Sequence, residues 1–269
     1  MNLIKAHAYG NDFLLLENRE LDDMPDRATL TRAVCDRHRG LGADGLIAFK
    51  LEGESRARMA LLNADGSYSE VSGNGVRCLA AWMAMEGDLS IGAAIEVDTD
   101  AGTKRLELLE RTDAEFTFRA AMGAPEDVRM ARIDVNGTAI DAATLRVGNP
   151  QCVVLGDVTV ERLRGLAASL AVHPHFPAGT NVELAAVEAP DRVRILIWER
   201  GVGPTESSGT GACAAAVAAI AFGGAARSLD VVSPGGVQHV EWRDEGLFLT
   251  GSAQVLAVCS WYGRRAPGA

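Results

Sequence analysis

Two stretches of the sequence decide the fold: VSGNGVRCLAAWMAMEG at residues 71–87 and SSGTGACAAAVAAIAFGG at residues 207–224. Each contains Ser-Gly-x-Gly, followed by a run that is apolar on nearly every face and ends at glycine. Glycine is a common helix terminator, and a helix that is apolar all round is buried. We therefore predict that each stretch forms the central helix of its own domain.

The chain carries an internal repeat, and these stretches are its clearest part. Ser72 and Ser208 are 136 positions apart, and other landmarks recur in the same order at offsets of 136 to 138. Repetition at one spacing indicates two copies of one structural unit. The matched landmarks include a Gly-Asn pair before an apolar run (Asn11, Asn149) and a polar residue nine positions before each serine (Asn63, Glu199).

The pattern between these landmarks predicts an α+β fold. Short apolar runs such as RVRILIWE (residues 192–199) alternate with Gly, Pro and Asp turns, which favours curved, mainly antiparallel sheets. We predict two similar, pseudo-symmetric domains, each a sheet around its buried helix, with the active site in the cleft between them. The expected domains are residues 1–120, completed by a C-terminal strand at about 253–269, and residues 121–252.

Composition and charge narrow the class of protein. The net charge is −10 with both signs interspersed, which argues against a nucleic-acid surface, and no stretch is apolar enough to span a membrane. The first residues lack the apolar core of a signal peptide, and five cysteines without a CxxC pair indicate reduced thiols. We therefore expect a cytoplasmic protein. The ligand spacings of a zinc site are missing, so no metal is expected.

The two serine loops have two interpretations. Serine at the start of a helix is a good N-cap, because its hydroxyl accepts a hydrogen bond from an exposed backbone N–H. The same glycine-rich helix start also suits a carboxylate, because its free N–H groups and the helix dipole attract anions. Pseudo-symmetry predicts that Ser72 and Ser208 face each other across the cleft.

Polar residues in register with the serines predict a ligand pocket. Asparagine in a turn is often there for its backbone tolerance. Here four asparagines at repeat-related positions accompany an arginine that can bind a carboxylate through two hydrogen bonds. This set suggests a pocket for a small zwitterionic ligand. Its members are Asn11, Asn63, Asn149, Asn181, Glu199 and Arg200.

The sequence resembles the diaminopimelate epimerases in motifs that follow one another along nearly the whole chain: GNDF, GADG, NADGS, SGNGVRC, GNPQCV, GTNVE, WERGVGPT and SGTGACAAAVAA. The resemblance implies an isomerase of lysine biosynthesis that uses no pyridoxal phosphate or other cofactor. It implies two residues that flank an amino-acid α-carbon, one removing its proton and the other delivering a proton to the opposite face. It also implies substrate binding by Asn11, Asn63, Gly73, Asn74, Asn149, Asn181, Glu199, Arg200, Gly209 and Thr210.

Two departures from the family pattern concern catalysis. The family has cysteines at the two proton-transfer positions, where this chain has Ser72 and Ser208. Cys78 and Cys213 match cysteines of the family's helices that are structural. The family usually reads GNPHC, with a histidine thought to poise the thiols, where this chain has Gln151. We expect natural divergence in which both thiols and their tuning partner were lost together.

The exchange of thiol for hydroxyl weakens the base. A free thiol has a pKa of about 8.5, whereas a hydroxyl lies close to bulk water at about 15.7, and this gap corresponds to roughly 10 kcal/mol at neutral pH. Three possibilities stay open. Ser72 and Ser208 form a slow acid–base pair, another group such as Glu199 is the base, or the protein has moved to easier chemistry.

We predict a diaminopimelate epimerase-like enzyme that interconverts L,L- and meso-diaminopimelate, a small-molecule amino-acid substrate. One alternative is another cofactor-independent isomerase or tautomerase of a carboxylic acid, and the other is a catalytically silent amino-acid-binding homologue. All three would keep the pocket. Tyr262 matches a position in the family's dimer contact, so a homodimer is expected, whereas nucleic-acid and membrane partners are not.

Overall fold

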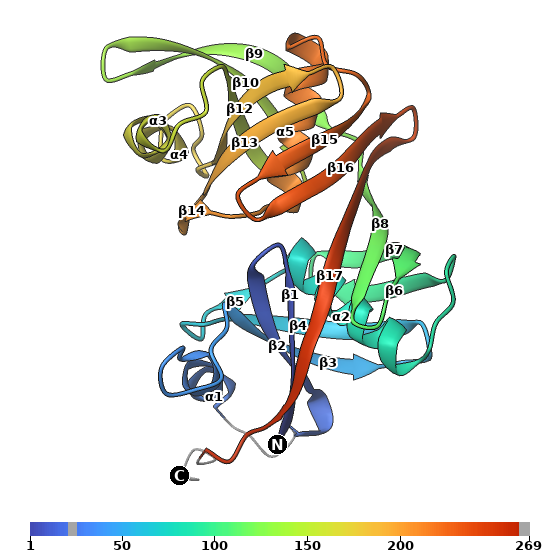
Figure 1. Ribbon diagram of the computed structural model, residues 1–269. Helices are drawn as coiled ribbons and strands as arrows, with labels where there is room; N and C mark the ends of the chain where they lie inside the picture. The colour runs from blue at the N-terminus through green and yellow to red at the C-terminus, as the bar shows by residue number, and fades with distance from the viewer. Residues whose placement is uncertain (21–25, 264–269) are drawn as a thin grey trace. The chain divides into compact units, whose positions relative to one another are not determined.

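The computed structural model describes residues 1–20 and 26–263, and the chain divides into two compact units (Figure 1). Unit 1 comprises Met1–Ala120 and the chain from Ser252 onward, and unit 2 comprises Ala121–Gly251. Both boundaries fall inside long strands, β8 and β17. The end of the expected C-terminal segment, residues 264–269, lies outside the described residues.

Unit 1 is a series of strands around helix α2. The strands pair in the order β17–β1–β2–β3–β4–β6–β7–β8, with β2–β3 and β4–β6 parallel and the other pairs antiparallel. Helix α2 packs against β1, β2, β6 and β7. The elements are β1 (Asn2–Ala8), β2 (Asn11–Glu17), η1 (Asn18–Glu20), α1 (Arg27–Cys35), β3 (Gly45–Leu51), β4 (Arg56–Asn63), β5 (Tyr68–Ser69), α2 (Gly73–Glu86), β6 (Ala94–Thr99), β7 (Gly102–Arg111), β8 (Glu115–Gly123) and β17 (Gly246–Ser260).

Unit 2 repeats this arrangement around helix α5. Its strands pair in the order β9–β10–β11–β12–β13–β15–β16–β17, with β11–β12 and β13–β15 parallel. Helix α5 packs against β10 to β13, β15 and β16. The elements are β9 (Glu126–Val135), β10 (Thr138–Val147), β11 (Asn149–Leu155), α3 (Val160–Arg162), η2 (Leu163–Ala167), α4 (Ala168–Ala171), β12 (Asn181–Ala189), β13 (Arg192–Glu199), β14 (Gly203–Thr205), α5 (Gly209–Phe222), β15 (Ser228–Ser233) and β16 (Gly236–Arg243).

Each central helix is buried as its composition predicts. Leu79 and Ala80 of α2, and every residue from Ala212 to Ala219 of α5, are 0% exposed. Burial of this apolar surface is the main favourable term in the folding of each unit. The predicted α+β fold, a mainly antiparallel sheet around a buried helix, is confirmed. The helical segment of unit 2 that precedes β12 contains a π-helical turn, η2, between α3 and α4.

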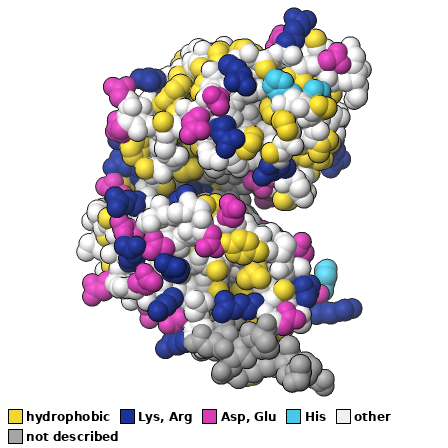
Figure 2. Space-filling model, turned by 180° about the vertical axis from the view of Figure 1, so that it is seen from behind, with side chains coloured by type: hydrophobic (Ala, Val, Ile, Leu, Met, Phe, Trp, Pro, Cys, Tyr) yellow, Lys and Arg dark blue, Asp and Glu magenta, His cyan; other side chains and the backbone are white. Residues whose placement is uncertain are grey.

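The surface carries charges of both signs. Figure 2 shows Lys and Arg side chains interspersed with Asp and Glu side chains on the face turned to the viewer. Exposed ion pairs of this kind contribute at most about 1 kcal/mol each, so they add little to the stability of the fold. None of the helices in the described part of the chain is long and apolar enough to cross a membrane.

Candidate functional site

Ser72 and Ser208 hold equivalent positions at the starts of α2 and α5. Each is the N-cap residue, and each hydroxyl accepts a hydrogen bond from a glycine N–H three residues on, from Gly75 at 3.1 Å and from Gly211 at 3.3 Å. A cap of this kind contributes about 1 kcal/mol. The remaining N–H groups of the first turn have no partner within the helix, so each helix start can also bind an anion.

In unit 1 the side chains beside Ser72 form a hydrogen-bonded chain. Asn74 is 5% exposed, its Nδ2 donates to Oδ1 of Asn11 at 3.2 Å, and its Oδ1 accepts a hydrogen bond from Arg77. Asn11 donates in turn to Oδ2 of Asp44 at 2.8 Å. The structure therefore brings two predicted site residues, Asn11 and Asn74, together at the start of α2.

The other predicted residues of unit 1 lie at its surface. Asn63 ends β4 and donates from Nδ2 to the Ser67 hydroxyl at 3.0 Å. Gly73 is the first residue of α2 and is exposed, and a Cβ placed on it would meet no atom within 4 Å. The space in front of this helix start is therefore open within unit 1, and a ligand could occupy it.

An ion-pair cluster lies next to Asn11 and is centred on the adjacent residue, Asp12. The Asp12 carboxylate contacts Lys5 Nζ at 2.5 Å and an Arg37 nitrogen at 2.7 Å, and Arg37 also bridges to Asp44 at 2.7 Å. Burial raises the pKa of the Asp12 carboxyl, but the hydrogen bonds and charges of Arg37 and Lys5 outweigh it and lower that pKa to about 2. The cluster fixes the loop that carries Asp44, the hydrogen-bond partner of Asn11.

We expect Asp12→Asn to lower the free energy of unfolding by about 2 kcal/mol near pH 7, because a lowered pKa stabilises the folded state above the ordinary value. In the parent this stabilisation should be lost as the pH falls from 3.8 toward about 2. Urea unfolding of parent and variant between pH 2 and pH 7 measures it. A difference that stays constant over this range would show that the carboxylate charge is not the cause.

In unit 2, Ser208 is paired with an acid. Ser208 is 6% exposed, and its hydroxyl lies close to the Glu199 carboxyl at the end of β13. Burial raises the pKa of the Glu199 carboxyl above its ordinary value, and the hydrogen bond from Ser208 offsets part of this rise. A nucleophile or acid–base hydroxyl is activated by an adjacent base. Glu199 can therefore accept the Ser208 proton.

Two further pairs complete the predicted set in unit 2. Asn181 Oδ1 accepts the Arg200 backbone N–H at 2.9 Å, and the exposed Arg200 guanidinium donates from Nη1 to the Ala178 carbonyl. Asn149 Oδ1 accepts a hydrogen bond from Gln151 Nε2 at 2.6 Å. Gln151 is 0% exposed and its amide does not titrate, so it cannot exchange protons with a neighbour. The last two predicted residues, Gly209 and Thr210, form the first turn of α5.

The cysteines of the central helices are packed in the cores. Cys78 and Cys213 are both 0% exposed, and all five cysteines are free. Burial raises the pKa of the Cys78 thiol to about 12. A buried thiol with so high a pKa is inert at neutral pH, so Cys78 cannot replace the missing thiol at position 72.

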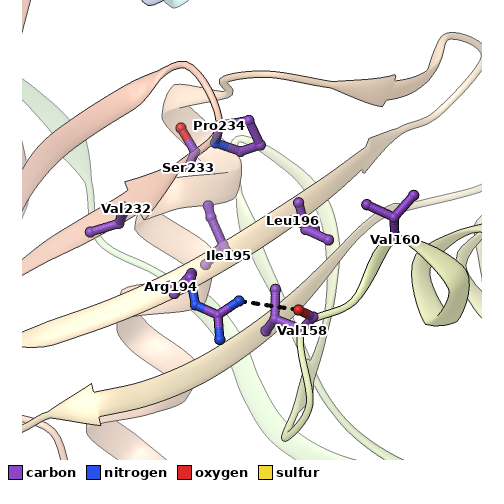
Figure 3. A pocket seen from close by; sticks show the side chains of 8 residues that line it. All are labelled: Val158, Val160, Arg194, Ile195, Leu196, Val232, Ser233 and Pro234. Atoms are coloured by element: carbon purple, nitrogen blue, oxygen red, sulfur yellow. Dashed lines mark hydrogen bonds between the residues drawn. The ribbon is translucent and has the colours of Figure 1, made fainter.

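A pocket of about 290 Å³ lies elsewhere on unit 2 (Figure 3). Its wall is mainly aliphatic, and its one charged residue, Arg194, is held by Glu188 at 2.6 Å and by the Val158 carbonyl at 3.1 Å. None of the predicted site residues lines it. The lining residues are Val158, Val160, Arg194, Ile195, Leu196, Val232, Ser233 and Pro234.

Two polar residues near the serines were not among the site residues predicted from the sequence. Asp44 lies in GADG and binds Asn11, and Glu183 lies in GTNVE, where it is 0% exposed beside the start of α5. The signal for Glu183 was present, because an acidic residue stands inside the apolar run of β12. The residues that surround Glu183 could not be read from the sequence, because they depend on strand register.

Comparison with known proteins defines the class of fold. A solved structure described as a predicted epimerase from Pseudomonas aeruginosa matches with a TM-score of 0.74 at 14% identity, covering 98% of this chain and 99% of that one. At this identity the likeness shows the fold alone. This protein therefore has an epimerase-type fold of two strand-wrapped helical units.

Sequence comparison then gives the family. The diaminopimelate epimerase family model matches residues 3–128 and 143–256. The diaminopimelate epimerase of Desulforudis audaxviator is 39% identical, covering 97% of this chain and 99% of that protein, and that of Desulfitobacterium hafniense is 36% identical, covering 94% and 95%. The chain belongs to the diaminopimelate epimerase family.

Proposed function

We propose that this protein is a cofactor-independent epimerase of diaminopimelate, with Ser72 and Ser208 at the two proton-transfer positions. One observation carries the proposal. Each unit places a serine hydroxyl at the N-terminus of its buried helix, among side chains able to bind an amino acid, in a chain of this family.

In the proposed reaction a serine on one face of the substrate removes the α-proton, and the other serine protonates the opposite face. When Ser208 acts as the base, the Cα–H bond breaks, Oγ takes that proton and Glu199 accepts the proton that Oγ gives up. The electron pair stays on the substrate and spreads into its α-carboxylate. Ser72 then donates its proton to the α-carbon and takes up a proton from water. Arg200 and the helix N–H groups stabilise the carboxylate as it gains charge.

The contact with Glu199 lowers the energetic cost of using a hydroxyl as the base at Ser208, but not at Ser72. A carboxylate that receives the proton avoids a free alkoxide, whose formation is opposed by roughly 10 kcal/mol relative to a thiolate. The contact described for Ser72 is its cap bond to Gly75, and Gln151 cannot titrate. We therefore expect slow epimerisation. Because Gln151 cannot titrate, it also favours a second candidate function. In this alternative the protein is an amino-acid-binding homologue that no longer catalyses the reaction.

We also propose a homodimer in the cytoplasm. Tyr262, at the position implied in the family's dimer contact, is 93% exposed in the single chain and is therefore free to enter an interface. Light scattering of the purified protein should give twice the mass of the 28.4 kDa chain. A monomer at micromolar concentration would contradict the proposed dimer.

Incubation with L,L-diaminopimelate, followed by chromatography that separates the stereoisomers, tests the function. We expect slow formation of the meso isomer by the parent and none by Ser208→Ala. Calorimetry with diaminopimelate and simpler amino acids runs beside it. Tight binding without meso product would support the binding homologue, and absence of both would reject the substrate class.

A further inference from the structure

The residues packed against the loops at Ser72 and Ser208 differ in chemical kind. In unit 1, a Cβ placed on Gly75 would lie 2.9 Å from Cδ1 of Ile47. In unit 2, a Cβ placed on Gly211 would lie 2.7 Å from Oε1 of Glu183. Ile47 and Glu183 are 136 positions apart, as are Gly75 and Gly211, so they occupy matching positions of the repeat. A carboxyl group therefore replaces an aliphatic side chain under the second loop.

Glu183 is enclosed, and within residues 1–20 and 26–263 it has no hydrogen-bond partner. It is 0% exposed in the middle of β12, between Val153 of β11 and Ile197 of β13 in the strand register. Neither carboxyl oxygen bonds to any group among the described residues. A buried carboxyl in this state is strongly unfavourable for folding, and Ile47 shows that the repeat accepts an aliphatic residue here. Glu183 therefore needs an explanation other than packing.

The groups around Glu183 set its protonation state. Those that titrate are Glu199, two positions beyond Ile197 on the same face of β13, and Cys152 of β11, whereas α5 contributes the uncharged Gly211 and Ser208. Burial raises the pKa of Glu183 well above its ordinary value of 4.5, and the negative charge of Glu199 raises it further. The pKa of Glu199 is also raised by burial, but the rise at Glu183 is the larger, so a single proton on the pair resides on Glu183.

The carboxyl also lies close to the reacting hydroxyl. The same Cβ point on Gly211 is 3.3 Å from Ser208 Oγ, so Glu183 Oε1 and Ser208 Oγ flank one glycine. Because the Ser208 hydroxyl also interacts with Glu199, the two carboxyl groups and the hydroxyl form one cluster at the start of α5. In such pairs one carboxyl holds a proton and the other is ionised, which separates the acid from the base.

We propose that Glu183 is a positioning residue that acts through Glu199: as a neutral acid, it leaves Glu199 as the single negative charge beside Ser208. The proposal rests on the proposed function, in which Glu199 takes the Ser208 proton. The pair then passes from one bound proton to two, and returns to one when Glu199 releases its new proton to water. Ionisation of Glu183 would add a second negative charge where negative charge must develop, and the reaction would slow.

The first test needs no activity. Carbon-13 NMR of protein labelled at the glutamate side-chain carboxyl is followed from pH 4 to pH 10, and the Glu183 signal is assigned by its loss in Glu183→Gln. We expect that signal to stay in the neutral-acid position through pH 7, and Glu199→Gln to lower its midpoint. A Glu183 signal that ionises near its ordinary value, or that does not respond to Glu199→Gln, would overturn the proposal.

The second test uses the pH dependence of α-proton exchange. The parent rate should fall by about tenfold per pH unit above the Glu183 midpoint seen by NMR, and Glu183→Gln should lack this fall. Ile47→Gln, which puts the same amide under the other loop, is the matched control and should keep it. Equal alkaline profiles in parent and Glu183→Gln would overturn the proposal. If the parent exchanges no α-proton at all, the proposed function fails, and the NMR titration still decides whether Glu183 and Glu199 form the pair.

Discussion

Replacing Ser72 and Ser208 together by cysteine is expected to raise epimerisation of diaminopimelate by at least about a thousandfold. The thiol removes most of the roughly 10 kcal/mol that opposes a hydroxyl base, and each 1.36 kcal/mol is a factor of ten in rate. Only part of this gain is expected, because Glu199 already assists Ser208. Stereoisomer chromatography of parent and variant measures it.

Each single replacement should help less than the pair, because one face of the substrate needs a base and the other needs an acid. Ser207→Cys is the matched control, since it adds a thiol one residue from Ser208 without changing either cap. The caps weaken when the hydroxyls are lost, so thermal unfolding is recorded for every variant. A folded double variant that binds diaminopimelate but does not epimerise it would mean that the serines are N-caps alone.

Arg200→Ala is expected to weaken binding of diaminopimelate by about 2–5 kcal/mol, because it removes a charge-assisted pair with the substrate carboxylate. Arg200 is suited to this role, since its backbone is held by Asn181 and one guanidinium nitrogen by Ala178. Arg200→Lys should recover only part of the affinity, because lysine keeps the charge but loses the two-pronged geometry. Calorimetry of the parent, Arg200→Ala and Arg200→Lys measures the affinity of each protein for diaminopimelate.

The control for Arg200 is Arg194→Ala in β13, the strand that ends just before Arg200. Arg194 is held by Glu188 and by the Val158 carbonyl and takes no part in the predicted pocket, so its loss should leave the affinity unchanged. Equal affinities for Arg200→Ala and Arg194→Ala would show that the carboxylate binds elsewhere.

Much of the fold could be predicted from the sequence, because its strongest signals are local. The apolar runs of α2 and α5 and the serines that precede them specify buried, capped helices without any tertiary information. The repeat spacing then predicts two similar units. The π-helical turn of η2 was not predicted, because the single Gly165 within it weakens a helix without specifying which backbone hydrogen-bond pattern forms.

The sequence predicted which residues belong to the candidate site, but it did not predict the contacts between them. The hydrogen bond between Asn11 and Asn74 joins positions 63 residues apart, and the interaction between Ser208 and Glu199 depends on where β13 ends relative to α5. Glu183 was missed for the same reason, because only the register of β11, β12 and β13 places its carboxyl under Gly211.

The most direct measurement for the central claim is proton NMR of L,L-diaminopimelate in D₂O with the parent protein, with Ser72→Ala and with Ser208→Ala. Loss of the α-proton signal reports proton abstraction itself, whether or not inversion follows. If Ser72 and Ser208 are the two proton-transfer groups, the parent should exchange the α-proton slowly and each alanine variant should lose epimerisation. Exchange that continues unchanged in both alanine variants would contradict the assignment of the serines.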